Sequence, residues 1–187
     1  MAVDGAFPKQ YTSIFSFILN SSAKTAFISK PVANLKSSMA YISAAQLAKI
    51  KELTNAGKSE GAEMWSAPCE IPNKGFWFAP TVFTNVSLSH RIAREEIFGP
   101  VLSVLTFRTP DEAIEKANNT PFGLSAGIWT EKCSRILEVA HRLRAGVVWA
   151  NTFNKFDPTS PFGGYKESGY GREGGRHGLE PYLKAGK

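Results

Sequence analysis

From residue 43 to residue 150 the apolar residues follow two alternating spacings, one typical of helices and one typical of buried strands. The first helical stretch begins at Ser43, a good capping residue, and carries Ile50 and Leu53 on one face. The elements expected after it are a strand at 80–86, helical turns at 90–96, a strand at 101–107, a helix at 110–118, a strand at 124–129, a helix at 132–145 and a strand at 147–150. This alternation predicts an α/β fold with a mainly parallel sheet covered by helices.

Residues that start and stop helices support two of these elements. Thr109 can cap the helix that follows it, Pro110 suits the first helical position, and Glu112 lies near the positive end of the helix dipole. Gly146 is expected to end the helix at 132–145.

The two ends of the chain lack this alternation. Residues 1–42 mix serines, lysines and scattered aromatic residues without sustained periodicity, so an irregular leader is expected. The segment from Gly163 to Gly178 holds seven of the 16 glycines, which predicts a loop with unusual backbone angles or close backbone approaches. The chain therefore divides into a leader, 1–42, and a domain, 43–187.

Length and composition limit the class of protein. The 187 residues suffice for one ordinary domain but not for separate cofactor and substrate domains. A hydrophobic content of 43% excludes a disordered or collagen-like chain. The net charge of +6 comes without arginine clusters or zinc-finger spacing, so nucleic acid is not an expected partner. No apolar run approaches the roughly 20 residues of a membrane span.

The two cysteines indicate a reducing compartment. Cys69 and Cys133 form no CxxC motif and no Cys/His cluster, so neither a disulfide framework nor a zinc site is indicated. A signal peptide is disfavoured because the apolar run Ile14–Leu19 is short and interrupted by Ser16. A cytoplasmic location is expected.

The segment Arg94–Val101 carries the most chemistry. Two acids, an aromatic residue and a Gly-Pro turn precede a buried strand, at the mouth of a sheet where α/β proteins form their sites. On the residues alone, the simpler interpretation is favoured, in which Glu95 and Glu96 form a solvated helix end.

Four motifs, in this order and at this spacing, resemble the aldehyde dehydrogenase superfamily. They are EEIFGPVLSV, EKANNTPFGLSAGIWT, RAGVVWANTF and SPFGGYKESGYGRE. The resemblance runs from about Ser43 to Tyr182 and is strongest to the first module of the family 16 members. It implies a partial aldehyde dehydrogenase catalytic domain, namely its C-terminal part.

The resemblance assigns a cofactor role to two residues. Glu96 matches the acid that accepts hydrogen bonds from the nicotinamide ribose hydroxyls of NAD, a role that suits a carboxylate because it has two oxygens. Phe98 matches the aromatic residue that bounds the nicotinamide ring. NAD, or NADP, is therefore the cofactor implied for the family, and this chain alone is not expected to bind it.

Two further aromatic residues match the family's aldehyde tunnel. They are Phe156 and Phe162, for which ordinary core packing is the alternative, and that alternative is favoured for Phe156 taken alone. The resemblance also implies that the glycines of the following loop are structural and that Trp149 and Asn151 anchor that loop.

The family's reaction uses parts that the sequence does not supply. A cysteine thiolate attacks the aldehyde carbon, hydride passes to NAD, and water activated by a glutamate releases the acid. Neither Cys69 nor Cys133 has the neighbours of that nucleophile, and neither the base nor most of the cofactor site is found. No catalytic residue is therefore assigned in this chain.

The chain is therefore expected to be a fragment of an NAD(P)-dependent aldehyde dehydrogenase that is inactive alone. The alternative is a non-catalytic module that pairs with an aldehyde dehydrogenase subunit, as a homo- or hetero-oligomer, or with another protein.

Overall fold

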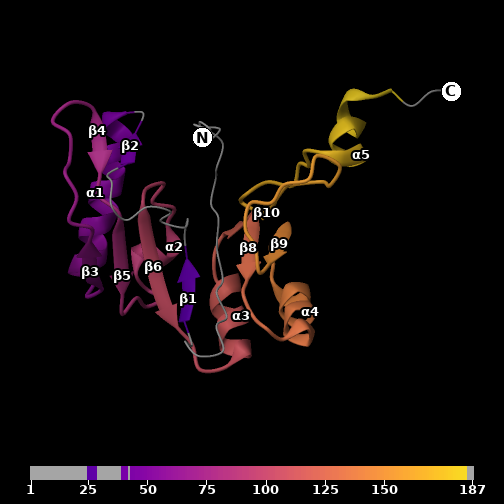
Figure 1. Ribbon diagram of the computed structural model, residues 1–187, viewed down its shortest axis with the longest axis horizontal. Helices are drawn as coiled ribbons and strands as arrows, with labels where there is room; N and C mark the ends of the chain where they lie inside the picture. The colour runs from indigo at the N-terminus through magenta and orange to yellow at the C-terminus, as the bar shows by residue number, and fades with distance from the viewer. Residues whose placement is uncertain (1–24, 29–38, 42, 185–187) are drawn as a thin grey trace, which may run out of the picture.

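The computed structural model describes residues 25–28, 39–41 and 43–184, and its mixture of helices and strands confirms the α/β class (Figure 1). The strands are β1 (Thr25–Ile28), β2 (Met39–Tyr41), β3 (Glu63–Ser66), β4 (Phe76–Phe78), β5 (Thr81–Thr84), β6 (Val101–Thr106), β7 (Phe122–Gly123), β8 (Ser125–Ile128), β9 (Val147–Ala150) and β10 (Tyr165–Lys166). The helices are α1 (Ala44–Ser59), α2 (Arg91–Arg94), α3 (Pro110–Asn118), α4 (Cys133–Arg142), α5 (Gly175–Leu179) and the 3-10 turn η1 (Glu180–Tyr182). Every element expected between residues 43 and 150 is present.

The sheets are mixed rather than mainly parallel. In the four-stranded sheet, of order β1-β6-β5-β3, only β5 and β6 run parallel, and β8 and β9 form a separate parallel pair. The pairs β1–β6, β3–β5, β2–β4 and β7–β10 are antiparallel. The physical reason lies in the connections: α2 and α4 bridge the parallel pairs, whereas the connection from β3 to β5 contains no helix.

Two strands lie in the segment where an irregular leader was expected. β1 pairs with β6 and β2 pairs with β4, both by backbone hydrogen bonds to strands far along the chain. These two segments show no sustained alternation in the sequence, so their partner strands determine them. The rest of the expected leader lies outside the described residues.

The expected helix starts are confirmed, and one expected helix end is wrong. The hydroxyl oxygens of Ser43 and Thr109 each accept a backbone N–H three residues on, both at 3.2 Å. Helix α4, however, ends at Arg142 and not at Gly146, because Leu143 is extended and its side chain is buried. Asn118 of α3 holds this end by donating from Nδ2 to the Arg142 carbonyl, 2.8 Å away.

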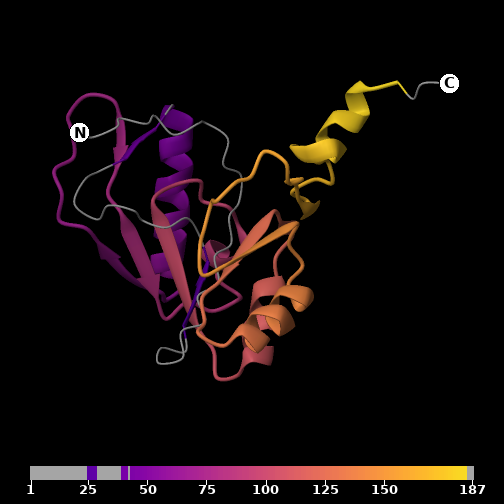
Figure 2. The same ribbon diagram turned by 45° about the vertical axis from the view of Figure 1, so that its right-hand side comes forward.

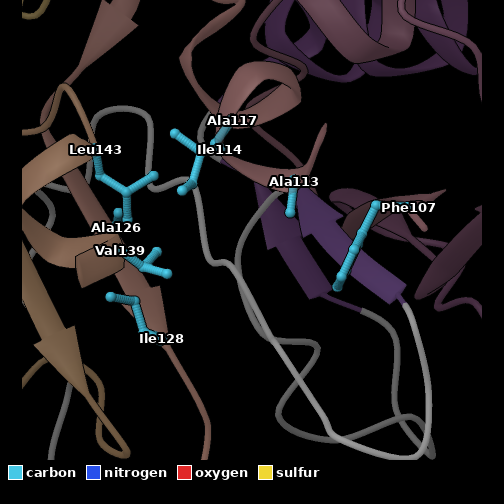
Figure 3. Close-up of a cluster of buried hydrophobic side chains, with 8 residues drawn as sticks. All are labelled: Phe107, Ala113, Ile114, Ala117, Ala126, Ile128, Val139 and Leu143. Carbon is cyan, nitrogen blue, oxygen red and sulfur yellow. The ribbon is translucent and has the colours of Figure 1, made fainter. Parts of the chain in front are cut away.

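Two groups of buried apolar side chains hold the helices on the strands. In the first, Ile50 and Leu53 of α1 pack with Phe83 of β5 and Val101 of β6. The second is shown in Figure 3, where side chains from α3, α4 and β8 lie together. Its members are Phe107, Ala113, Ile114, Ala117, Ala126, Ile128, Val139 and Leu143.

Residues 176–184 form a C-terminal arm, which contains most of α5 and all of η1. Both views show it extending away from the rest of the molecule (Figures 1 and 2). Neither α5 nor η1 has a buried residue. Leu179, Tyr182 and Leu183 are exposed, Tyr182 by 85%. Within the described part of the chain, no helix is long and apolar enough to cross a membrane.

Candidate functional site

The first part of the candidate site is the acidic loop, residues 95–100, which joins α2 to β6. The loop is fixed at both ends, because the Ser103 hydroxyl of β6 donates to the Ile92 carbonyl of α2 over 3.0 Å, and Thr81 of β5 donates from its backbone to the Pro100 carbonyl over 2.8 Å. Ser103 and Thr81 are both fully buried. A loop held by buried hydrogen bonds presents its side chains in a fixed direction.

Within the acidic loop, the two acids have different surroundings. Arg91 donates to both carboxylate oxygens of Glu95, at 2.6 and 3.0 Å, and also to Glu52 of α1 at 3.0 Å. The Arg91 guanidinium lowers the pKa of the Glu95 carboxyl. Glu95 therefore belongs to an ion-pair network that joins α2 to α1. Glu96, the acid to which the resemblance assigns the cofactor role, lies half-buried in the same loop.

Phe98 is held with its ring partly in solvent. Its φ of +57° is unusual for an aromatic residue, and 38% of the side chain is exposed. Gln46 of α1 donates from Nε2 to the Phe98 carbonyl over 3.1 Å. At Gly99 an added Cβ would come within 2.9 Å of Ile50, which is fully buried. The packing of α1 on the loop therefore fixes the backbone that carries Phe98.

The second part of the site is the aromatic cluster, made of Trp129, Trp149, Phe153, Phe156 and Phe162. The structure brings Phe156 and Phe162 together edge to face, with ring centroids 4.9 Å apart, and both pack on Trp149. Phe156 is 47% exposed, so it lines a surface and is not a core residue. The cluster lies where β8 and β9 end, the usual position of ligand sites in parallel α/β units.

The glycine-rich segment after Phe162 is held by a residue that sequence reasoning did not single out. Arg172 donates from Nη1 to the carbonyls of Gly164, Tyr170 and Gly171, at 2.8 to 3.0 Å, and its guanidinium lies over the Tyr165 ring. An arginine inside a run of glycines, where many carbonyls lack regular partners, is the signal that could have revealed it.

A surface cleft of about 350 Å³ beside the acidic loop was also not foreseen. Its lining consists of Ser89, Arg91, Arg94, Glu95 and Pro121. The cleft brings Pro121 next to α2, a proximity that sequence spacing does not reveal.

The structure places the assigned residues in two separate segments. Glu96 and Phe98 precede β6, whereas Phe156 and Phe162 follow β9. Cys69 lies in the loop after β3 and Cys133 begins α4, so neither cysteine lies in a segment that carries an assigned residue. Among the residues that the structure describes, no group of three or more His, Cys, Asp or Glu side chains could hold a metal ion.

Comparisons with known proteins agree with this architecture. The sequence model of the aldehyde dehydrogenase family matches residues 11–186. An aldehyde dehydrogenase of Enchytraeus buchholzi is 50% identical over 139 residues, which cover 74% of this chain and 28% of that protein.

Two solved structures share the fold. The NAD-dependent aldehyde dehydrogenase of Sinorhizobium meliloti has a TM-score of 0.73 and 47% identity, over 76% of this chain and 28% of that one. The NAD+ complex of an aldehyde dehydrogenase from Bacillus cereus has a TM-score of 0.73 and 42% identity, over 78% and 30%. The chain thus spans less than a third of the length of these relatives. With a family match over most of its residues, the chain belongs to the aldehyde dehydrogenase family.

Proposed function

We propose that this chain is the C-terminal part of the catalytic domain of an NAD-dependent enzyme that oxidises aldehydes to carboxylic acids. The observation that carries the proposal is the acidic loop, in which Glu95 is bound to Arg91 while Glu96 and Phe98 occupy a rigid turn beside it. Residues 43–187 would form this part of the domain. From the resemblance of its motifs we further propose a closer relation to the first module of the family 16 members.

The residues of the acidic loop fit the nicotinamide end of NAD. Glu96 offers a half-buried carboxylate that can accept from two ribose hydroxyls. Phe98 offers a partly exposed ring, and at the next residue, Gly99, an added Cβ would come within 2.9 Å of the buried Ile50 side chain. When bound, NAD supplies the hydride acceptor. The role of this chain is to orient the ribose and to limit the space that the nicotinamide ring can occupy.

The aromatic cluster fits the apolar part of an aldehyde. Phe156 and Phe162 present ring edges and faces packed on Trp149, and such a surface binds carbon chains while it excludes water.

The chain contains neither the sequence motif around the family's nucleophilic cysteine nor the family's glutamate base, so we infer that it does not turn over aldehydes alone. Both cysteines are free, which supports a cytoplasmic location.

A chimera tests this proposal directly. Residues 43–184 of this chain would replace the matching segment of the Sinorhizobium meliloti enzyme, and NADH formation from an aldehyde would be followed by absorbance. We expect the chimera to be active and the isolated chain to be inactive. Glu96→Ala in the chimera should raise KM for NAD by about tenfold, the effect of losing one to two charge-assisted hydrogen bonds.

Glu95→Ala is the matched control for Glu96→Ala. It removes the neighbouring carboxylate, which is bound to Arg91, and should lower thermal stability while it leaves KM for NAD unchanged. Equal effects of both substitutions on KM, or NADH formation by the isolated chain that Glu96→Ala abolishes, would contradict the proposal.

The C-terminal arm favours a second candidate function. Its apolar residues Leu179, Tyr182 and Leu183 are exposed, and we infer that they contact another polypeptide, with an aldehyde dehydrogenase subunit as the proposed partner. Copurification with a full-length aldehyde dehydrogenase, lost on Tyr182→Ser with Leu183→Ser, would support this function. A strictly monomeric chain that such a subunit does not retain would contradict it.

A further inference from the structure

Asn151 connects the ends of two neighbouring strands through its side chain. Its Oδ1 accepts from the Thr130 backbone N–H at 2.9 Å, and its Nδ2 donates to the Thr130 carbonyl at 3.0 Å. The backbone N–H of Asn151 donates to the Ile128 carbonyl at 2.7 Å. The parallel pairing of β8 and β9 ends at Ile128 and Ala150. Beyond it, the side-chain amide of Asn151 continues the hydrogen bonding between the two chain segments.

The backbone of Asn151 also changes direction at this point. Its φ is +52°, in the left-handed region that asparagine tolerates better than most residues. The chain therefore leaves the sheet immediately after the last bond of β9. The segment that follows carries Phe153, Phe156 and Phe162, three of the five rings of the aromatic cluster.

Thr130, the partner of Asn151, fixes the other side of the cluster. It is buried, it follows Trp129 directly, and its hydroxyl accepts from the Lys132 backbone at the start of α4. Phe153 lies between the two tryptophans, 6.4 Å from Trp129 and 5.0 Å from Trp149 between ring centroids. The contact between Asn151 and Thr130 therefore sets the spacing of the strand ends across which these rings meet.

We propose that Asn151 is a positioning residue for aldehyde binding, acting through its two-point contact with Thr130 to hold the aromatic cluster in its binding arrangement. The inference rests on the proposed aldehyde-binding function of that cluster. Asn151 is itself exposed, so replacing it leaves no internal void and its effect passes through the two hydrogen bonds.

The test uses the indole N–H signals of the whole chain, labelled with ¹⁵N. The four tryptophans report on separate places: Trp129 and Trp149 lie in the cluster, whereas Trp65 and Trp77 lie on β3 and β4. Asn151→Gly removes the amide but keeps a residue that accepts a positive φ. We expect it to shift the Trp129 and Trp149 signals, to leave those of Trp65 and Trp77 in place, and to weaken benzaldehyde binding by about three- to tenfold.

Asn118→Ala is the matched control. Asn118 makes the same kind of two-point contact, with the Arg142 carbonyl and the Arg144 N–H, but it joins α3 to the end of α4. It should lower the Tm without moving the cluster signals. Asn151→Asp, which keeps the acceptor for the Thr130 N–H, should fall between wild type and Asn151→Gly.

The outcomes separate this inference from the proposed function. If Asn151→Gly lowers only the Tm, or if Asn118→Ala moves the cluster signals equally, the positioning role is overturned. If benzaldehyde does not shift the Trp149 signal of the wild-type chain, the proposed aldehyde site is wrong. The spectra without benzaldehyde still decide whether Asn151 holds the rings.

Discussion

The backbone of Gly163 lies so close to Gly146 that a side chain at residue 146 would clash with it. An added Cβ at Gly146 would lie 1.8 Å from the Gly163 carbonyl oxygen, a backbone atom that cannot turn aside. The contact places Gly163, and with it Phe162, against the entry to β9. Gly146→Ala should therefore destabilise the chain by about 3 kcal/mol, because the backbone must separate, and urea denaturation measures this loss.

Gly171→Ala is the control for that substitution. Gly171 lies in the same glycine-rich segment, and an added Cβ there would meet nothing within 4 Å. We expect a change within about 0.5 kcal/mol. A loss at Gly171 as large as that at Gly146 would show that the segment is sensitive to any methyl group and that the close approach is not the cause.

The roles of individual residues were only partly accessible from the sequence. The resemblance assigned a cofactor role to Glu96 but gave no role to Glu95. The ion-pair network that holds Glu95 includes Glu52, which lies 39 residues before Arg91 and meets it only in the folded chain. Phe156 shows the same limit, since its exposure follows from how the segment after β9 folds onto Trp149.

At the scale of the element, Glu112 links a residue just before helix α3 to a lysine on the next turn of the helix. Glu112 accepts from the Arg108 backbone N–H at 2.8 Å and pairs with Lys116 at 2.8 Å, and together these contacts lower its pKa to about 2, Lys116 contributing most. The folded-state pKa lies below the unfolded value. The stabilisation is thus complete above about pH 4.5 and is lost as the pH falls towards 2.

Glu112→Gln should remove this part of the acid sensitivity. We expect the variant to have a lower Tm than wild type at pH 6 and the two Tm values to converge as the pH approaches 2, which a thermal-melting series measures. Glu115→Gln, on the same helix but outside this network, serves as control. A Tm difference for Glu112→Gln that stays constant from pH 6 to pH 2 would exclude the ionised carboxylate as its source.

Elements with local signals were predictable, and elements fixed by distant contacts were not. Thr109, Pro110 and Glu112 predict the start of α3, and the helix begins at Pro110 in the structure. The end of α4 was not predictable, because it depends on a hydrogen bond from Asn118 and on the burial of Leu143. The strands β1 and β2 likewise depend on partners far along the chain.

At the scale of the molecule, the sequence predicted the class but not the sheet directions. Helical crossovers give the parallel pairs β5–β6 and β8–β9, and this part was readable from the alternation of strands and helices. The antiparallel pair β3–β5 is joined without a helix, whereas the pairs β1–β6, β2–β4 and β7–β10 bring together strands that other elements separate along the chain. The division at residue 42 stays a prediction, although β1 pairs with the sheet and the family match begins at residue 11.

The C-terminal arm should contribute almost nothing to the stability of the isolated chain. Neither α5 nor η1 buries a residue, and the arm extends away from the rest of the molecule (Figure 2). Deleting residues 176–187 should therefore change the free energy of unfolding by less than about 0.5 kcal/mol, whereas Leu53→Ala, in the core, should cost about 2–5 kcal/mol. Urea denaturation of both variants measures the contrast. A loss above about 1 kcal/mol on deletion would mean that the arm packs on its own chain, and its exposed residues would then no longer support a partner.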